Sequence, residues 1–207
     1  MAAGAILSDA DRVRIRQAVA AAEAKTSGEI FMVVAEECDD YRFIPLLWAT
    51  LIALIAPLPL IFLTLWPASL IWLTQLAAFV VLAIGFSLPS VRPAVVPRRV
   101  KREAARAVAA QQFLAHGLHT TEARTGVLIF VALAEHHAEI IADTGIASKV
   151  DAGAWQAAMD KLTGEVAAGR LAEGLIAAID STGTILARHF PRAQGDRNEL
   201  SNDLILL

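Results

Sequence analysis

Residues 43–91 read FIPLLWATLIALIAPLPLIFLTLWPASLIWLTQLAAFVVLAIGFSLPSV and include no charged residue, although the segments on either side are dense with charge. A helix that crosses a bilayer needs about 20 consecutive apolar residues, so this stretch is long enough to cross twice. The segment Trp66-Pro67-Ala68-Ser69 interrupts it, because proline lacks an amide donor and disfavours helix in the residue before it. The sequence therefore predicts two transmembrane helices, about 44–65 and 70–88, joined by a tight turn.

Prolines and tryptophans inside this stretch refine the prediction. Pro57 and Pro59 fall within the first predicted span and should kink it, which neighbouring helices make tolerable in lipid. Trp48, Trp66 and Trp72 lie near predicted span ends, where amphipathic rings favour the membrane interface. The alternative is a buried helical hairpin of a soluble protein. Soluble core helices normally interrupt their apolar face with polar residues, and this stretch contains few of them.

The flanking charges predict an orientation. Arg42 precedes the first span, and the turn between the spans carries no Lys or Arg. Five basic residues follow the second span: Arg92, Arg98, Arg99, Lys101 and Arg102. Because cytoplasmic flanks of membrane spans carry an excess of Lys and Arg, we expect both termini in the cytoplasm and the turn outside.

Composition narrows the function classes. The formal net charge of −3 over 207 residues gives no sign of a nucleic-acid partner, and the basic cluster after the second span is explained by membrane topology and anionic headgroups. The single cysteine, Cys38, excludes an internal disulfide and fits a reducing compartment. The N-terminal residues 1–7 are too short for the apolar core of a signal peptide.

Outside the hairpin, helical and strand patterns alternate. Short apolar runs predict strands at 29–35, 126–133 and 138–143. Amphipathic patterns and capping residues predict helices at about 9–25, 98–115, 151–168 and 170–190. Alternating strands and helices favour an α/β sandwich. The first two strands should be parallel neighbours joined by a crossover that contains the hairpin, and the third should run antiparallel to the second.

This reading divides the chain into three parts. Residues 1–42 and 92–190 form one discontinuous α/β domain, residues 43–91 form the transmembrane hairpin, and residues 191–207 form a C-terminal tail.

Several segments of the predicted domain resemble the TPM domain family. They are TSGEI at 26–30, RTGVLI at 124–129, IIADTGI at 140–146, GR at 169–170 and LI at 175–176. The family includes a plant thylakoid-lumen protein of photosystem II repair, an animal acetylcholine-receptor modulator and many bacterial membrane proteins. The chain most resembles a bacterial subgroup in which a membrane hairpin interrupts the domain, which implies a multi-pass protein of the bacterial inner (plasma) membrane.

The resemblance implies a three-layer α/β/α sandwich with an inserted two-helix transmembrane hairpin. It also implies the activities associated with the plant member, which are acid phosphatase activity and divalent-metal binding. The chain departs from that branch at Asp143-Thr144-Gly145, where plant-like members carry Gly-Tyr-Gly.

Polar residues follow the first two predicted strands at the same edge of the sheet. They are Glu36, Glu37 and Asp39 after the first strand, and Glu135, His136 and His137 after the second. Open α/β sheets usually bind ligands at the carboxyl ends of their strands, and carboxylates with imidazoles are suitable ligands for a divalent metal ion. The alternative is a solvated turn beside a charged strand end.

A second polar group is predicted at the opposite edge. Glu29 opens the first strand, Arg124 and Thr125 precede the second, and Asp143 follows the third. Glu29 and Arg124 are interpreted most simply as a structural ion pair. Glu29 and Asp143 acting as metal ligands are the alternative.

Two functions follow as hypotheses. The favoured one is a membrane-anchored interaction or quality-control module, whose partners are the lipid bilayer and other membrane proteins. It rests on the hairpin and on the absence of phosphate-loop, dinucleotide, zinc-protease and nucleophile-elbow motifs. The alternative is a metal-dependent acid phosphatase-like hydrolase that uses one of the two acidic edges. The sequence leaves the oligomeric state open.

Overall fold

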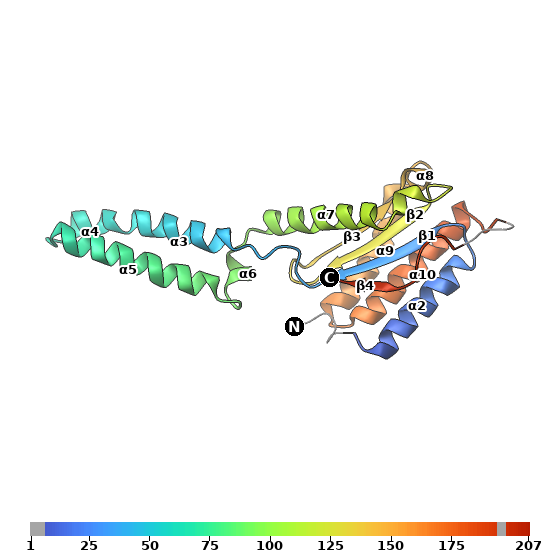
Figure 1. The fold of residues 1–207 in the computed structure, drawn as a ribbon, viewed down its shortest axis with the longest axis horizontal. Helices are drawn as coiled ribbons and strands as arrows, with labels where there is room; N and C mark the ends of the chain where they lie inside the picture. The colour runs from blue at the N-terminus through green and yellow to red at the C-terminus, as the bar shows by residue number, and fades with distance from the viewer. Residues whose placement is uncertain (1–6, 194–197) are drawn as a thin grey trace. The chain divides into compact units, whose positions relative to one another are not determined.

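The computed structural model describes residues 7–193 and 198–207. The chain divides into two compact units (Figure 1). One takes in the chain up to Cys38 and from Arg102 onward, and the other is Asp39–Lys101. The second unit contains the whole apolar stretch, and it begins four residues before the predicted hairpin and ends ten residues after it.

The first unit is built on a four-stranded sheet in the order β3-β2-β1-β4. Strand β1 (Glu29–Ala35) pairs in parallel with β2 (Gly126–Ala132), from Glu29 opposite Gly126 to Ala35 opposite Ala132. Strand β3 (His137–Ala142) runs antiparallel to β2. The parallel and antiparallel pairings predicted from the sequence are confirmed, with the β2–β3 turn one residue earlier than predicted.

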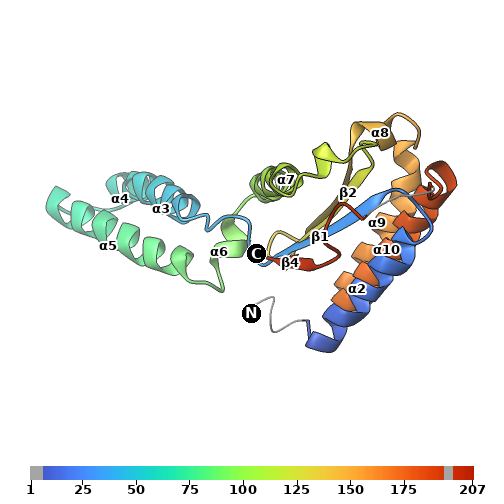
Figure 2. The same cartoon turned by 45° about the vertical axis from the view of Figure 1, so that its right-hand side comes forward.

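Helices cover both faces of this sheet, and β1 and β2 are therefore buried along their whole length. Ile30, Met32 and Val34 of β1 face the core shared with α2 (Asp9–Glu23), α9 (Ala152–Ala167) and α10 (Leu171–His189). The alternate residues Phe31 and Val33 face α7 (Arg98–Ala115). Figure 2 shows α7 on one side of the sheet and the other three helices on the opposite side. The α/β/α sandwich is therefore confirmed.

Local sequence signals explain where these helices begin and end. Ser8 caps α2 by accepting a hydrogen bond from the Asp11 backbone, and the Asp11 carboxylate returns the contact to Ser8 N. Gly117 ends α7 in the left-handed region at φ 69°. Short elements that the sequence analysis did not assign are α6 (Arg92–Val95), the 3₁₀ turn η1 (Leu118–Thr120) and α8 (Thr144–Ala147).

The C-terminal segment differs from its prediction as a tail. Leu204–Leu206 forms β4, which pairs in parallel with β1 and places Leu204 opposite Met32. The segment therefore supplies the edge strand of the sheet. Three residues are too few to show strand periodicity in the sequence, and their conformation depends on the free edge of β1.

The second unit consists of apolar helices. Helix α3 (Phe43–Ile55) is followed after Ala56 by α4 (Pro57–Leu63), and α5 (Ala68–Ser87) runs back. The helix assignment breaks at Ala56, directly before Pro57, where the sequence predicts a kink. Helices α3 and α5 pack on each other through Ala49 and Ala53, which are buried. Phe43–Leu63 and Ala68–Ser87 are each long and apolar enough to cross a membrane.

Candidate functional site

The carboxyl ends of β1 and β2 are joined by hydrogen bonds. The amide of Ala134, in the β2–β3 turn, donates to the Glu36 carbonyl at 2.9 Å. The amide of Cys38 donates to Oε1 of Glu135, also at 2.9 Å. Glu135 is only 7% exposed. Its carboxylate therefore forms a buried link between the β2–β3 turn and the segment that follows β1. Such a charge-assisted hydrogen bond is about twice as strong as a neutral one.

The three acidic residues that follow β1 are arranged differently from one another. Glu36 is half-buried, whereas Glu37 and Asp39 are exposed. Asp39 accepts a hydrogen bond from the Tyr41 amide at 3.3 Å. This contact turns the backbone locally in the manner of an Asx turn.

The two histidines also have different surroundings. His136 is exposed in the turn, with a backbone φ of 49° that histidine tolerates better than most residues. His137 is half-buried, and its Nε2 lies 3.5 Å from Oε2 of Glu139. That carboxylate oxygen lies 3.9 Å from Nε of Arg106 in α7. The sequence analysis did not identify Glu139 or Arg106, although Glu139 lies two residues after His137 on the same face of β3.

A cavity of about 450 Å³ lies beside the β2–β3 turn. Its walls are mostly apolar, and the side chains of His136, His137 and Thr163 contribute the polar groups. The Thr163 hydroxyl donates to the Met159 carbonyl of its own helix at 2.8 Å. The cavity is large enough for a small organic ligand, and the two histidines are its titratable groups.

The predicted metal ligands do not form a metal centre. Within residues 7–193 and 198–207, no three His, Cys, Asp or Glu side chains are placed to hold one ion. Glu135 binds a backbone amide and His137 faces Glu139. The structure therefore brings Glu36 and Glu135 to one edge, as the parallel sheet predicts, without making them joint ligands.

At the opposite edge of the sheet, where β1 and β2 begin, Glu29 is buried and forms hydrogen bonds with the C-terminal segment. Its carboxylate oxygens accept hydrogen bonds from the backbone amides of Glu199 at 3.1 Å and Leu200 at 3.3 Å. Arg124 is exposed, with a left-handed φ of 54°. Backbone donors from a distant segment therefore bind the Glu29 carboxylate. The Glu29–Arg124 ion pair stays a prediction.

Asp143 lies at the same edge but forms different contacts from Glu29. Its Oδ1 accepts the Thr144 amide at 2.6 Å and caps the short helix α8. Its own amide donates to the Gly126 carbonyl, while Glu29 pairs with Gly126 from the other side. Strand β2 therefore separates the backbones of Asp143 and Glu29 by two strand spacings, about 10 Å.

A small cavity at this edge contains residues that the sequence analysis missed. It measures about 130 Å³, and its polar lining comes from Glu23, Thr26, Glu29, Arg192, Asn198 and Asn202. Glu23 accepts hydrogen bonds from the Ile30 amide at 3.0 Å and from Nδ2 of Asn202 at 2.6 Å. Burial raises the pKa of Glu23 to about 7, and the negative charge of Glu29 adds to the rise. Glu23 therefore links α2, β1 and the C-terminal segment.

Comparison with known proteins gives a family match for part of this chain. A family model described as TPM domain matches residues 90–185, which include β2, β3 and α9. No curated protein matches the chain.

A solved structure similar to this one is the NMR structure of BA42 protein from the psychrophilic bacterium Bizionia argentinensis. The two share 19% sequence identity over 97% of this chain and 95% of that chain, with a TM-score of 0.63. At this identity the likeness establishes a shared fold. The family match and the α/β/α architecture together support the resemblance of residues 90–185 to the TPM domain family, while the subgroup with an inserted membrane hairpin stays a prediction.

Proposed function

We propose that this chain is a membrane-anchored TPM protein that acts as an interaction or quality-control module for other membrane proteins. The observation that carries the proposal is the pair of apolar helices inserted between β1 and α7. Each is long enough to span a bilayer. The spans lie in the plasma membrane of a bacterium, and the TPM domain lies on its cytoplasmic face.

The exposure of the hairpin supports a lipid environment. Within its own unit, α5 buries none of its residues, and side chains such as Phe62 (82% exposed) and Val81 (68% exposed) are mostly uncovered. Exposed apolar surface costs about 25 cal/mol per Å² in water, so a hairpin of this size is stable only where lipid or protein surrounds it. The buried residues of α3 are Pro45, Ala49 and Ala53.

The arrangement of the sheet edges supports an interaction role over catalysis. The buried carboxylates that a hydrolase would use as ligands or bases are engaged with backbone amides: Glu135 with Cys38, Glu29 with the C-terminal segment, and Asp143 with Thr144. A catalytic group must instead face the reacting atoms.

A metal-dependent acid phosphatase-like hydrolase is the second candidate. The cavity of about 450 Å³ that His136 and His137 line favours it. This reaction needs a divalent metal ion to stabilise the charge on the transferring group. The described side chains offer no set of three ligands for one ion, so they do not fit such a metal ion.

The test uses the full chain in its native membrane. We would extract the membranes with alkaline carbonate and place a photo-crosslinking amino acid at His136 or at Arg124, which are exposed at opposite edges of the sheet. The proposal predicts that the chain stays in the membrane pellet and that at least one position forms a discrete adduct with another integral membrane protein. Release by carbonate, or the absence of a protein adduct from both positions, would contradict it.

A further inference from the structure

The hairpin unit carries its charge at one end only. The turn between α4 and α5, residues 64–67, is uncharged, and no acidic residue lies between Asp40 and Glu103. The residues of this unit that follow α5 include four basic ones: Arg92, Arg98, Arg99 and Lys101. A hairpin that crosses a bilayer therefore presents an uncharged surface to one leaflet and a basic surface to the other.

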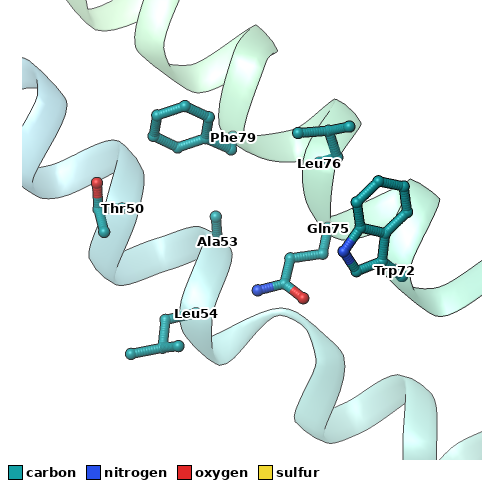
Figure 3. Close-up of a pocket in the computed structure, with 7 residues that line it drawn as sticks. All are labelled: Thr50, Ala53, Leu54, Trp72, Gln75, Leu76 and Phe79. Carbon is teal, nitrogen blue, oxygen red and sulfur yellow. The ribbon is translucent and has the colours of Figure 1, made fainter.

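The spans themselves offer little that could recognise a lipid headgroup. The Thr50 hydroxyl donates to the Leu46 carbonyl of its own helix at 2.8 Å. Figure 3 shows Gln75 reaching from α5 into a groove of about 240 Å³ between α3 and α5, towards Ala53 and Leu54. These polar groups are turned inward or bonded within their own helix, so headgroup recognition is left to the ends of the spans.

The segment that follows the second span is packed against the base of the hairpin. Helix α6 contacts both α3 and α5. The indole Nε1 of Trp48 in α3 donates to the Val95 carbonyl at 3.1 Å, and the next residue, Val96, is only 4% exposed. Tryptophan rings favour the membrane interface. Because Arg98 follows Val95 by three residues, about 10 Å of chain at most, these contacts hold the start of α7 near the interface.

Arg98 and Lys101 lie three residues apart and share one face of α7. Arg98 is exposed and Lys101 is half-buried. Within the residues that the structure describes, neither side chain forms an ion pair or a hydrogen bond with the protein. By contrast, Arg42 at the start of the first span pairs with Asp40 at 2.6 Å. The positive charge of Arg98 and Lys101 is therefore available to an anion from outside the chain.

We propose that Arg98 and Lys101 bind the headgroup phosphate of an anionic phospholipid in the leaflet on the side of the TPM domain. The inference rests on the proposed membrane anchoring and adds a lipid class as a partner. Arginine binds phosphate through paired N–H groups, and lysine adds a point charge. Basic residues next to a membrane span favour anionic lipids in this way.

The position of the site favours a lipid over a soluble anion. The contact between Trp48 and Val95 keeps the site at the base of the spans, where lipid phosphates surround the chain. The headgroup of phosphatidylcholine carries its own cation, which cancels much of the attraction. The site should therefore distinguish phosphatidylglycerol from phosphatidylcholine.

The test measures lipid binding to the full chain in neutral detergent micelles, titrated with phosphatidylglycerol or phosphatidylcholine and followed by native mass spectrometry. We expect tighter binding of phosphatidylglycerol. Arg98→Gln should raise its dissociation constant about 5-fold, and Arg98→Gln with Lys101→Gln about 25-fold. The matched control is Arg12→Gln with Arg188→Gln, which removes two exposed positive charges from the other unit and should leave the dissociation constant unchanged.

Four results would overturn the inference: equal affinity for the two lipids, wild-type affinity in the Arg98 and Lys101 double variant, an equal loss in the control, or displacement of the lipid by inorganic phosphate at the same concentration. The last would assign the site to a soluble anion. Carbonate extraction of the wild-type chain separates these outcomes from the proposed function. A chain that stays in the membrane without preferring phosphatidylglycerol contradicts only the lipid site, whereas release from the membrane contradicts the anchoring.

Discussion

The two units of this chain use similar apolar residues in opposite ways. In the α/β unit up to Cys38 and from Arg102 onward, called here the TPM unit, Phe130 is completely buried between the sheet and α7. In the hairpin unit, Asp39–Lys101, Phe62 is 82% exposed. The TPM unit removes its apolar side chains from water by packing them on one another. The hairpin unit, with a larger share of such residues, packs few of them. The comparison teaches that a high apolar content predicts that side chains are shielded from water. An uncharged apolar helix of about 20 residues predicts that lipid, and not a protein core, shields them.

The largest expected effect comes from truncating the same residue type in both units. Phe130→Ala should lower the free energy of unfolding of the TPM unit by about 3–5 kcal/mol, because it leaves a cavity in a close-packed core. Phe62→Ala should change it by less than about 0.5 kcal/mol, because Phe62 has no role in that core. Chemical denaturation of the full chain in detergent, followed by near-ultraviolet circular dichroism, measures both. Equal losses would remove the distinction between the units.

A charge placed on each unit gives the next largest effect. Val81 is exposed within α5, and Val13 is exposed on α2. Val81→Lys should oppose membrane insertion by about 2.5–3.5 kcal/mol and release a large share of the chain into the soluble fraction. Val13→Lys should leave insertion unchanged and alter stability by less than about 0.5 kcal/mol. If Val81→Lys partitions like wild type, the lipid-facing assignment of α5 is incorrect.

A smaller effect concerns the link between α2 and the C-terminal segment. Because the pKa of Glu23 is raised in the folded state to about 7 from an ordinary value of 4.5, the folded protein binds the extra proton between these values. The contribution of the neutral group to stability is complete below about pH 4.5 and is lost as the pH rises through about 7. After a discount for partial solvent screening, we expect a fall of about 1–2 kcal/mol across this window.

Glu23→Gln should flatten that pH dependence, since the amide cannot ionise. Glu122→Gln, which changes an exposed carboxylate elsewhere in the TPM unit, should leave it intact. Urea unfolding at intervals from pH 4.5 to pH 8 measures the slope for each chain. An unchanged slope in Glu23→Gln would mean that another group titrates.

The smallest expected effect is on phosphate-ester hydrolysis. We predict that the full chain releases phosphate from generic esters no faster than the double variant His136→Ala, His137→Ala, with Mg²⁺, Mn²⁺, Zn²⁺ or Ca²⁺ supplied in turn. The reason is that no three described side chains are placed to hold one ion. A metal-dependent rate that disappears in the double variant would make the hydrolase the better proposal.

The fold could be predicted where residue pattern and length act together. Strands β1 and β2 are continuous apolar runs buried on both faces, and the uncharged stretch with its prolines predicts the hairpin and its break at Pro57. Strand β4 could not be predicted in this way, because Leu204–Leu206 is too short to show a pattern and becomes a strand by pairing with β1.

The candidate sites show the same limit. Parallel pairing correctly places Glu36 and Glu135 at one edge of the sheet, and the sequence identifies Glu29 as a polar residue at the other. Their contacts are tertiary: Glu29 binds amides of Glu199 and Leu200, about 170 residues away along the chain. No local sequence pattern predicts that the C-terminal segment packs against Glu29. The raised pKa of Glu23 is invisible for the same reason, since its burial depends on the returning C-terminal segment.

The most direct test of the account is the sidedness of the chain in intact cells. In a Cys38→Ser background, single cysteines replace Ala68 at the start of α5, Lys25 after α2 and Lys149 after α8, and a membrane-impermeant thiol reagent is applied before and after lysis. The account predicts that Ala68→Cys reacts in intact cells, whereas Lys25→Cys and Lys149→Cys react only after lysis. Labelling of Lys25→Cys or Lys149→Cys from outside, or protection of Ala68→Cys until lysis, would contradict a two-span anchor with a cytoplasmic TPM domain.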